Sequence, residues 1–348
     1  MNKHILKGGL GFLFLSVALS SCKSSQEVAS KKESIGINVG YMDKTVNPAD
    51  DFNRYVNGTW LDKTEIPADR TRWGSFDELR KNTDDDVMAI LKEAIKDKTI
   101  DPNSDQAKAI SLYKTVLDTV SRNKAGIDPL KPYLDKINSV QNADQLVALL
   151  AEMEPEMGLG FFGSYIGADA KNSNKNVIYV GTGSLGLPDR DYYVSDAPDN
   201  KEKREKYVVH VTRMLQYLGD KPEQAKANAE KILALEIEMS KPRFDRVERR
   251  DRRKSYNPMT VAEIQKLTPS IDWTTYFTKI GLPTNQTIIV SQPKYMTALE
   301  TLFKENKVDD WKAYMRWSLL NRAASQLSTE IEKANWEFYG KTLTGAVK

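Results

Sequence analysis

The sequence predicts a mainly α-helical protein with a few short strands. In many long segments, apolar residues recur at the three- and four-residue spacing of an amphipathic helix, whereas strict alternation is rare. Two short runs rich in β-branched residues, 177–180 and 288–290, are the clearest candidates for strands. The 348 residues are 40% hydrophobic and 28% charged, which supplies enough apolar material for a sizeable buried core.

Helical periodicity is expected over most of the chain after residue 75. The expected helices run over about 76–95, from 104 to about 120, and over 143–153, 201–218, 223–239, 295–303 and 311–338. A short helix is expected after Thr260, because Glu263 follows at the spacing of a capping box. Asp128-Pro129 and Lys131-Pro132 interrupt the pattern. Residues 157–186 are instead rich in glycine, aromatic and β-branched residues, and they carry the first predicted strand.

The stretch 47–80 contains a dense set of turn and helix-start signals. Asn57-Gly58, a dipeptide that favours turns, lies between apolar anchors. Ser75 is the expected N-cap of the first long helix, because Glu78 follows three residues later. The stretch therefore predicts a turn that leads into the start of a helix.

Charged residues in this region and beyond admit more than one interpretation. On residue types alone, Arg72 could grip a carboxylate or form a structural ion pair with Asp69 or Asp77. The three successive carboxylates at 84–86 point in different directions on a helix, which favours a solvated face over a cation site. The basic run 246–254 is interrupted by acidic residues and is expected to be solvated and self-paired.

Residues 1–21 are typical of an export signal, because two lysines precede an apolar run that is too short to span a bilayer as a helix. The run ends in Leu19-Ser20-Ser21-Cys22, which resembles the lipoprotein box of bacteria and makes Cys22 the expected lipidation site. The alternative is an ordinary cleaved signal with an incidental cysteine. Residues 22–38 are polar and predict a flexible tether. We therefore expect a bacterial envelope lipoprotein, held to a membrane through Cys22, in the periplasm or on the outer membrane.

Composition argues against several other functions. The formal charge of +3 falls to about +1 without Lys3 and Lys7, which gives no reason to expect nucleic acid as a partner. A single cysteine excludes an intrachain disulfide, and nothing singles out a catalytic triad. The two histidines are His4 and His210, and a lone histidine in a helix is more often structural than a metal ligand. The glycines of 158–163 lack the strand–helix context of a nucleotide loop, so tight backbone packing is expected there.

Several motifs follow one another in a fixed order along the chain. They are D-D-F-x-x-Y-V-N-G-x-W from Asp50, I-P-A-D from Ile66, R-W-G-S-F-D-E-L-R from Arg72, G-L-P-D-R-D-Y-Y at 186–193, K-S-Y-N-P-M-T at 254–260, P-S-I-D-W at 269–273, S-Q-P at 291–293 and W-K-A-Y-M-R-W at 311–317. Together they resemble the neprilysin and endothelin-converting-enzyme family of zinc metallopeptidases, and its bacterial oligopeptidase-type members in particular. The resemblance covers the chain from about Val46 to its end. It implies that residues 39–348 form the multi-helical N-terminal lobe of such a peptidase.

The resemblance also implies a zinc site whose ligands this chain does not contain. The family site resembles H-E-x-x-H on one helix with a downstream glutamate, and His4 and His210 cannot form it. The segment 335–345 resembles the family sequence just before the catalytic half. We therefore expect the chain to be the N-terminal half without the catalytic half, inactive alone, with zinc and the catalytic domain as its missing complements.

Four residues of R-x-x-x-F-D-x-x-R acquire roles from the resemblance. Arg72 is expected to grip the free C-terminal carboxylate of a bound peptide, and Phe76 is expected to line the S1′ pocket. Asp77 and Arg80 are expected to border S2′. The alternative is that both arginines pair with neighbouring carboxylates and merely stabilise the start of the helix.

Two functions remain open at this point. In the first, the chain is the substrate-enclosing half of an exported zinc metalloendopeptidase, which excludes water and positions peptides. In the second, it is a lipid-anchored module that binds peptides or a partner without cleaving them. An inactive remnant that folds poorly is a third outcome.

Overall fold

The computed structural model describes residues 36–347, and the chain divides into two compact units between Ile66 and Pro67. The expected signal, the lipidation site Cys22 and most of the expected tether lie outside the described residues. Among the helices of residues 36–347, none has the length and apolar character that crossing a membrane requires.

The first unit is organised by one helix. It contains the 3-10 turn η1 (Val39–Tyr41) and helix α1 (Phe52–Lys63). Asp51 is the N-cap of α1, and its carboxylate accepts a backbone N–H of the first turn. The turn predicted at Asn57-Gly58 is wrong, because both residues lie inside α1. A Cβ on Gly58 would come within 2.5 Å of the Cβ of Asp43, so this glycine makes room for close packing.

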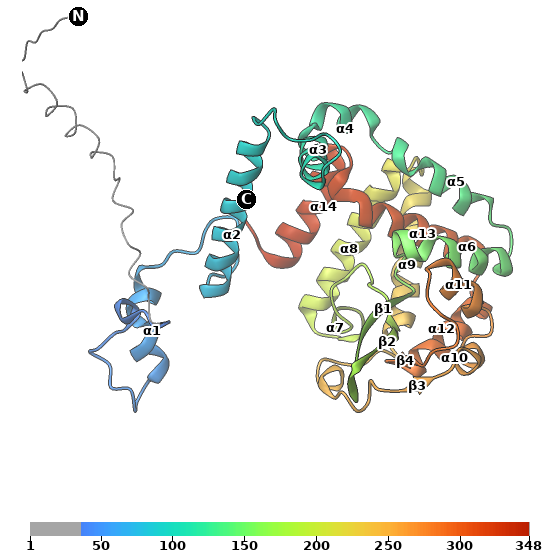
Figure 1. The fold of residues 1–348 in the computed structure, drawn as a ribbon. Helices are drawn as coiled ribbons and strands as arrows, with labels where there is room; N and C mark the ends of the chain where they lie inside the picture. The colour runs from blue at the N-terminus through green and yellow to red at the C-terminus, as the bar shows by residue number, and fades with distance from the viewer. Residues whose placement is uncertain (1–35, 348) are drawn as a thin grey trace, which may run out of the picture. The chain divides into compact units, whose positions relative to one another are not determined.

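The second unit is mainly helical, and the predicted fold class, mainly α with a few short strands, is confirmed. Its α-helices are α2 (Ser75–Ala94), α3 (Asp105–Leu117), α4 (Thr119–Ala125), α5 (Lys131–Ser139), α6 (Ala143–Met157), α7 (Asp191–Val194), α8 (Pro198–Tyr217), α9 (Pro222–Ser240), α10 (Val261–Leu267), α11 (Trp273–Lys279), α12 (Pro293–Glu305), α13 (Val308–Ala323) and α14 (Thr329–Trp336). Helix α13 packs against α6, α8 and α9 (Figure 1). These helices surround the main core.

Local signals explain where helices begin and end between 104 and 139 and between 311 and 338. The predicted interruption at the two prolines is also the start of new elements, and two predicted helices are each divided in two. The prolines at 129 and 132 begin the short turn η2 (Asp128–Leu130) and helix α5, where a missing N–H costs nothing. Asp118 ends α3 and caps α4, which divides the helix predicted from 104 to about 120. The helix predicted over 311–338 is interrupted at η4 (Ala324–Gln326), after which Ser328 caps α14.

The second unit contains a small four-stranded sheet. Its strands are β1 (Phe162–Asp169), β2 (Asn172–Thr182), β3 (Pro258–Met259) and β4 (Ile288–Val290), in the order β1-β2-β4-β3. β1 and β2 form an antiparallel hairpin, β2 runs parallel to β4, and β3 is antiparallel to β4. Both predicted strands are confirmed within β2 and β4, whose residues Val180 and Val290 are direct neighbours in the register. The hairpin partner β1 was not predicted.

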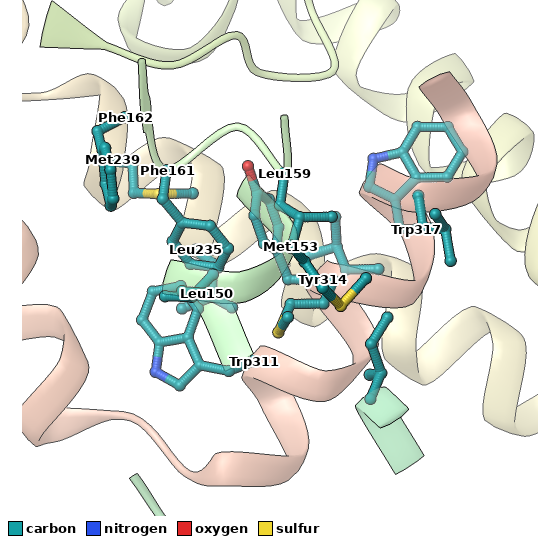
Figure 2. Close-up of a cluster of buried hydrophobic side chains, with 14 of the residues drawn as sticks. Leu150, Met153, Leu159, Phe161, Phe162, Leu235, Met239, Trp311, Tyr314 and Trp317 are labelled. Atoms are coloured by element: carbon teal, nitrogen blue, oxygen red, sulfur yellow. The ribbon is translucent and has the colours of Figure 1, made fainter. Parts of the chain in front are cut away.

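The core is centred on Phe161, just before β1. Its ring lies 5.7 Å from Phe303, 5.4 Å from Trp311 and 5.0 Å from Tyr314, measured between ring centroids. Leu150 of α6 and other apolar side chains of α6, α9 and α13 fill the space around these rings (Figure 2). Full burial of such a side chain stabilises the fold by about 1.5–3 kcal/mol, so the core holds the sheet and these helices together.

His210 of α8 lies in an aromatic part of the same core and is only 5% exposed. Its ring stacks on Phe338 at 4.6 Å and meets the edges of Trp317 and Tyr339 at 5.6 Å each. Its Nε2 has no hydrogen-bond partner among the described residues. Burial, assisted by the nearby Arg213, lowers the pKa of His210 to about 3, so the ring is neutral at ordinary pH.

His210→Phe should make the protein less sensitive to acid. Between pH 6.5 and about 3, the unfolded chain binds a proton at this histidine that the folded chain does not, so the native protein loses stability as pH falls. One such proton costs about 1.4 kcal/mol per pH unit. Urea unfolding at pH 7.5 and pH 5.0 should therefore show that the change in unfolding free energy on acidification is about 2 kcal/mol more favourable in the variant than in the native protein.

Phenylalanine is a suitable replacement because the surrounding rings already form edge and stacked contacts. A second variant, His210→Leu, controls for the shape of the new ring and should show the same reduced pH dependence. An identical change in unfolding free energy between the two pH values in the native protein and both variants would show that His210 does not create this acid sensitivity.

Candidate functional site

The residues singled out from the sequence as substrate-binding lie at and before the start of α2. The chain leaves Gly74 in an extended conformation, and the Gly74 carbonyl accepts the N–H groups of Asp77 and Glu78 at 2.9 Å each. Gly74 is therefore the N-cap, and the prediction that Ser75 caps the helix is wrong. Ser75 is the first helical residue, since the carbonyl before it already accepts the first helical hydrogen bonds.

Arg72 lies in the turn before α2 with 86% of its side chain exposed. Its Nε is 3.9 Å from an oxygen of Asp77, whose side chain is mostly covered. At that distance and exposure the ion pair contributes little, and most donors of the guanidinium stay available. Asp69, the other predicted partner, lies instead 3.4 Å from Arg70. The turn thus presents Arg72 outward beside one carboxylate.

Phe76 and Arg80 follow on α2 at positions i and i+4, which share a face of a helix. Phe76 is 87% exposed, and Arg80 is exposed with no ion-pair partner among the described residues. None of the residues of α2 is buried in the described chain. The helix start therefore combines two exposed cations with an exposed aromatic ring, an arrangement that can receive a carboxylate next to an apolar side chain.

A second polar feature, Glu154 near the end of α6, was not predicted. Its carboxylate is buried and accepts the backbone N–H of Leu159 at 2.7 Å. Burial raises the pKa of Glu154 to about 8, against the lowering effect of that hydrogen bond. The side chain holds the glycine loop after α6. There a Cβ on Gly160 would lie 2.3 Å from the carbonyl oxygen of Ser184, so the predicted tight backbone packing is confirmed.

Glu236 of α9 is a second buried carboxylate that the sequence analysis missed. It accepts the N–H of Gly186 at 3.0 Å and the hydroxyl of Tyr193 at 2.9 Å. Burial raises the pKa of Glu236 to about 7 despite these hydrogen bonds and one from Tyr207. A signal was present in the sequence, because Glu236 follows Ile232 by four residues and so lies on the buried face of α9.

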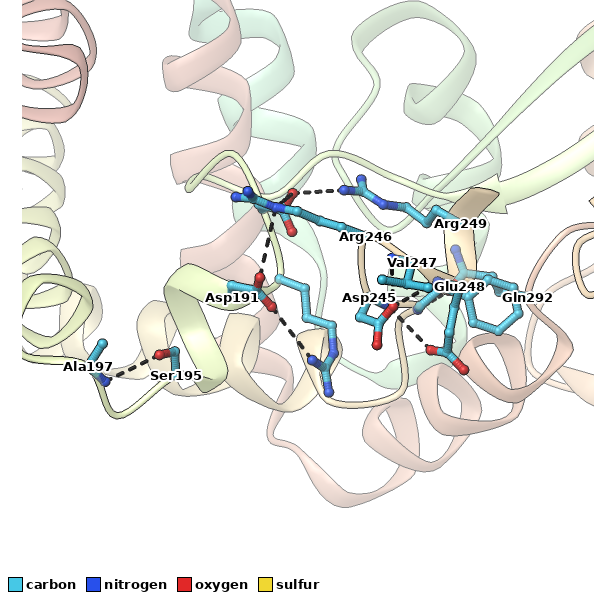
Figure 3. A network of polar contacts seen from close by, with 12 residues as sticks. Asp191, Ser195, Ala197, Asp245, Arg246, Val247, Glu248, Arg249 and Gln292 are labelled. Atoms are coloured by element: carbon cyan, nitrogen blue, oxygen red, sulfur yellow. Dashed lines mark hydrogen bonds and ion pairs between the residues drawn. The ribbon is translucent and has the colours of Figure 1, made fainter. Parts of the chain in front are cut away.

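The basic run 246–254 is partly self-paired, as expected, and partly bound to the loop before α7. Within the run, Lys254 lies 3.1 Å from Glu248. Outside it, Arg246 and Arg249 approach one oxygen of Asp189 at 3.3 and 2.8 Å (Figure 3). Burial would raise the pKa of Asp189, but the two arginines outweigh it and hold that pKa below its usual value. The run therefore fastens this loop through two ion pairs to Asp189.

Zinc ligands are not assembled by the residues that the structure describes. Residues 36–347 contain no group of three or more His, Cys, Asp or Glu side chains placed to hold a metal ion. His210, the one histidine among them, is enclosed by aromatic rings. Its surroundings do not fit a zinc site, and no catalytic step of this chain is assigned to zinc.

Comparison with known proteins agrees with the motifs and with the fold. Residues 48–348 match the model of the N-terminal region of peptidase family M13. Endothelin-converting enzyme 1 of Cavia porcellus is 28% identical over 313 residues, which cover 85% of this chain and 40% of that enzyme. Neprilysin-3 of Drosophila melanogaster is 25% identical over 314 residues, which cover 84% of this chain and 40% of that protein.

Solved structures give the same result at the level of the fold. Zinc metalloprotease Zmp1 of Mycobacterium tuberculosis, solved with an inhibitor, superposes with a TM-score of 0.81 and 31% identity over 90% of this chain and 48% of that one. PepO of Lactobacillus rhamnosis superposes with a TM-score of 0.70 at 18% identity over 87% of this chain and 48% of that chain, which shows the shared fold alone. The chain spans less than half the length of these relatives. It belongs to peptidase family M13, the neprilysin and endothelin-converting-enzyme family of zinc metallopeptidases, and corresponds to the N-terminal domain of that family.

Proposed function

We propose that this chain is the N-terminal, substrate-enclosing part of an exported zinc metalloendopeptidase that acts on peptides. The observation that carries the proposal is the set of exposed side chains at the start of α2, namely Arg72, Phe76 and Arg80. It is supported by the match of residues 48–348 to the family. In such a peptidase the zinc ion supplies the activation of water, and the residues that would hold it are not in this chain. The contribution of this part is binding and orientation of the peptide.

Arg72 is proposed to bind the free C-terminal carboxylate of a peptide. Its guanidinium is exposed and weakly paired, so little has to be broken before two parallel N–H···O hydrogen bonds form. Arg72 would have to exchange its 3.9 Å contact with Asp77 for the peptide. A charge-assisted hydrogen bond of this kind contributes about 1.5–3 kcal/mol.

Phe76, Asp77 and Arg80 are proposed to shape the subsites next to that carboxylate. The exposed ring of Phe76 gives an apolar wall for the S1′ side chain, where burial of a large apolar group contributes about 1.5–3 kcal/mol. Asp77 and Arg80 offer one charge of each sign along the neighbouring subsite, S2′. This assignment predicts discrimination between peptides by their C-terminal group and by the size of the residue at S1′.

Arg72→Ala should weaken the cleavage of peptides with a free C-terminal carboxylate, because the variant loses the proposed charge-assisted grip. The measurement requires the catalytic part of a family member, supplied by fusion or in trans. The value of kcat/KM should fall about 10- to 100-fold for free-acid peptides and should hardly change for the same peptides with an amidated C-terminus.

Arg70→Ala is the matched control, because Arg70 is the neighbouring exposed arginine and lies against Asp69. It should leave both classes of peptide unaffected. Equal losses on free-acid and amidated peptides with Arg72→Ala would mean that Arg72 only stabilises the start of α2, and the substrate assignment would be wrong.

The chain alone should show no zinc-dependent peptide hydrolysis, because its two histidines cannot form the ligand set. The purified chain would be incubated with a peptide mixture and Zn²⁺, with and without a chelator, and the products followed by mass spectrometry. Cleavage that the chelator abolishes would contradict the prediction. The non-catalytic binding module would be favoured by a different result. In that case the chain binds peptides tightly, and its fusion to a catalytic part still binds them but does not cleave them.

Attachment of the chain to an envelope membrane through acylated Cys22 is a further part of the proposal. Two or more acyl chains hold a protein stably, because each buried CH₂ contributes about 0.8 kcal/mol. Cys22→Ser should therefore move the protein from the membrane fraction to the soluble fraction of expressing cells. Ser24→Ala, a substitution two residues away, should not. If the Cys22→Ser protein still sediments with membranes, the lipid-anchor proposal is wrong.

A further inference from the structure

Three motifs of the sequence that the proposed substrate site does not use meet at one cavity. The cavity has a volume of about 570 Å³ and lies in the second unit. Arg190 comes from the 186–193 motif, Lys254 and Asn257 come from the 254–260 motif, and Gln292 comes from the 291–293 motif. Distant segments therefore supply polar side chains to the same space, beside the network of Figure 3.

The charges around this cavity are mainly positive. It is lined by Arg190, Lys241, Arg243, Lys254 and Lys294, against a single carboxylate from Glu248. Three of the cations already have partners. Lys241 lies 2.5 Å from Glu238, Lys254 lies 3.1 Å from Glu248, and Arg243 donates to the carbonyl of Gly183 at 2.8 Å. Among the cations of this lining, Arg190 and Lys294 are the two whose side chains donate no hydrogen bond to any residue of 36–347.

The side chain of Arg190 makes no hydrogen bond within the described chain, although only 28% of it is exposed. Its Nε is completely buried, and the nearest carboxylate oxygen, of Asp191, lies 3.8 Å from Nη1, too far for a hydrogen bond. The other carboxylate that it faces, Asp245, is occupied by the N–H groups of Val247 and Glu248 at 2.8 and 2.7 Å. A buried, unbonded guanidinium donor is costly, which indicates a partner that residues 36–347 do not provide.

Gln292, which comes from another segment of the lining, supports the same conclusion. It is 8% exposed, and its Oε1 accepts the N–H of Phe244 at 2.6 Å. This contact fixes the side-chain amide, and its Nε2 donates to no described residue while it lines the cavity. Gln292 is also the N-cap of α12, whose first free backbone N–H is that of Lys294, because Pro293 has none. The helix N-terminus adds a favourable field for an anion.

We propose that this cavity binds a phosphate-class oxyanion, held by Arg190, Gln292, Lys294 and the N-terminus of α12. These donors come from two separate segments, the loop before α7 and the start of α12, and several N–H groups on separate segments suit a tetrahedral anion better than a planar carboxylate. A phosphate also carries between one and two negative charges at pH 7, which matches a lining with an excess of cations. The source is either inorganic phosphate or a small phosphomonoester.

The test is a titration of the full chain with sodium phosphate, followed by calorimetry and by thermal unfolding at constant ionic strength. Phosphate should raise the unfolding temperature where chloride at the same ionic strength does not. Arg190→Gln should weaken phosphate binding about tenfold or more, and Lys294→Gln severalfold. Arg252→Gln is the matched control, because Arg252 is an exposed arginine of the same basic run that does not line the cavity.

The results of this titration distinguish inorganic phosphate from a phosphomonoester as the ligand, and some of them would refute the site. Binding of both inorganic phosphate and glycerol phosphate assigns a phosphomonoester, whereas binding of inorganic phosphate alone assigns the free anion. Acetate or glutarate binding as tightly as phosphate would replace the phosphate assignment by a carboxylate site. No binding, or equal binding by Arg190→Gln, Lys294→Gln and the control, would refute the site. Lys294 is exposed, so its variant tests the proposal even if Arg190→Gln does not fold.

Discussion

The buried carboxylate of Glu236 is the contact on which the loop before α7 depends. It binds the N–H of Gly186 and the hydroxyl of Tyr193, and Tyr193 in turn accepts the N–H of Leu187 at 2.6 Å. From the C-terminal side, Tyr339 donates to the carbonyl of Gly186 at 2.8 Å. One acid on α9 therefore fixes the loop that leads to Arg190, and with it one wall of the proposed anion site.

Burial of the Glu236 carboxylate makes the stability of the fold depend on pH, and the buried His210 contributes a pH dependence of the opposite sign. Glu236 has a pKa of about 7 in the folded chain and an ordinary value of 4.5, so its contribution to stability falls as pH rises between these values. His210 has the opposite sign, because its lowered pKa makes stability fall as pH decreases below 6.5. Between pH 4.5 and 6.5 the slope from His210 opposes the slope from Glu236, and the raised pKa of Glu154 adds a second slope of the same sign as that of Glu236.

The sequence was informative where structure depends on local signals. Period and cap residues predicted the helical class, and two β-branched runs located β2 and β4. The errors arose where the same local signal serves two structures. Asn57-Gly58 can make a turn, but here Asp43 packs against Gly58 inside a helix. The prolines at 129 and 132 interrupt the helical pattern as predicted, but they also suit a first turn and begin α5, which was not predicted. Strand β1 needs its hairpin partner before its glycine-rich sequence can be recognised as a strand.

The two proposed sites differ in whether local sequence or tertiary packing brings their residues together. Arg72, Phe76, Asp77 and Arg80 lie close together in sequence on a helix start with no buried residue, so a motif was enough to bring them together. Local signals support that helix, among them two acids in its first turn and the Lys81–Asp85 pair at 2.5 Å. Arg190 and Gln292, by contrast, meet only after the sheet, α9 and α12 have packed, and no periodicity could have paired them. Core substitutions should therefore disturb the anion cavity before they disturb the start of α2, since only the cavity depends on tertiary packing for its shape.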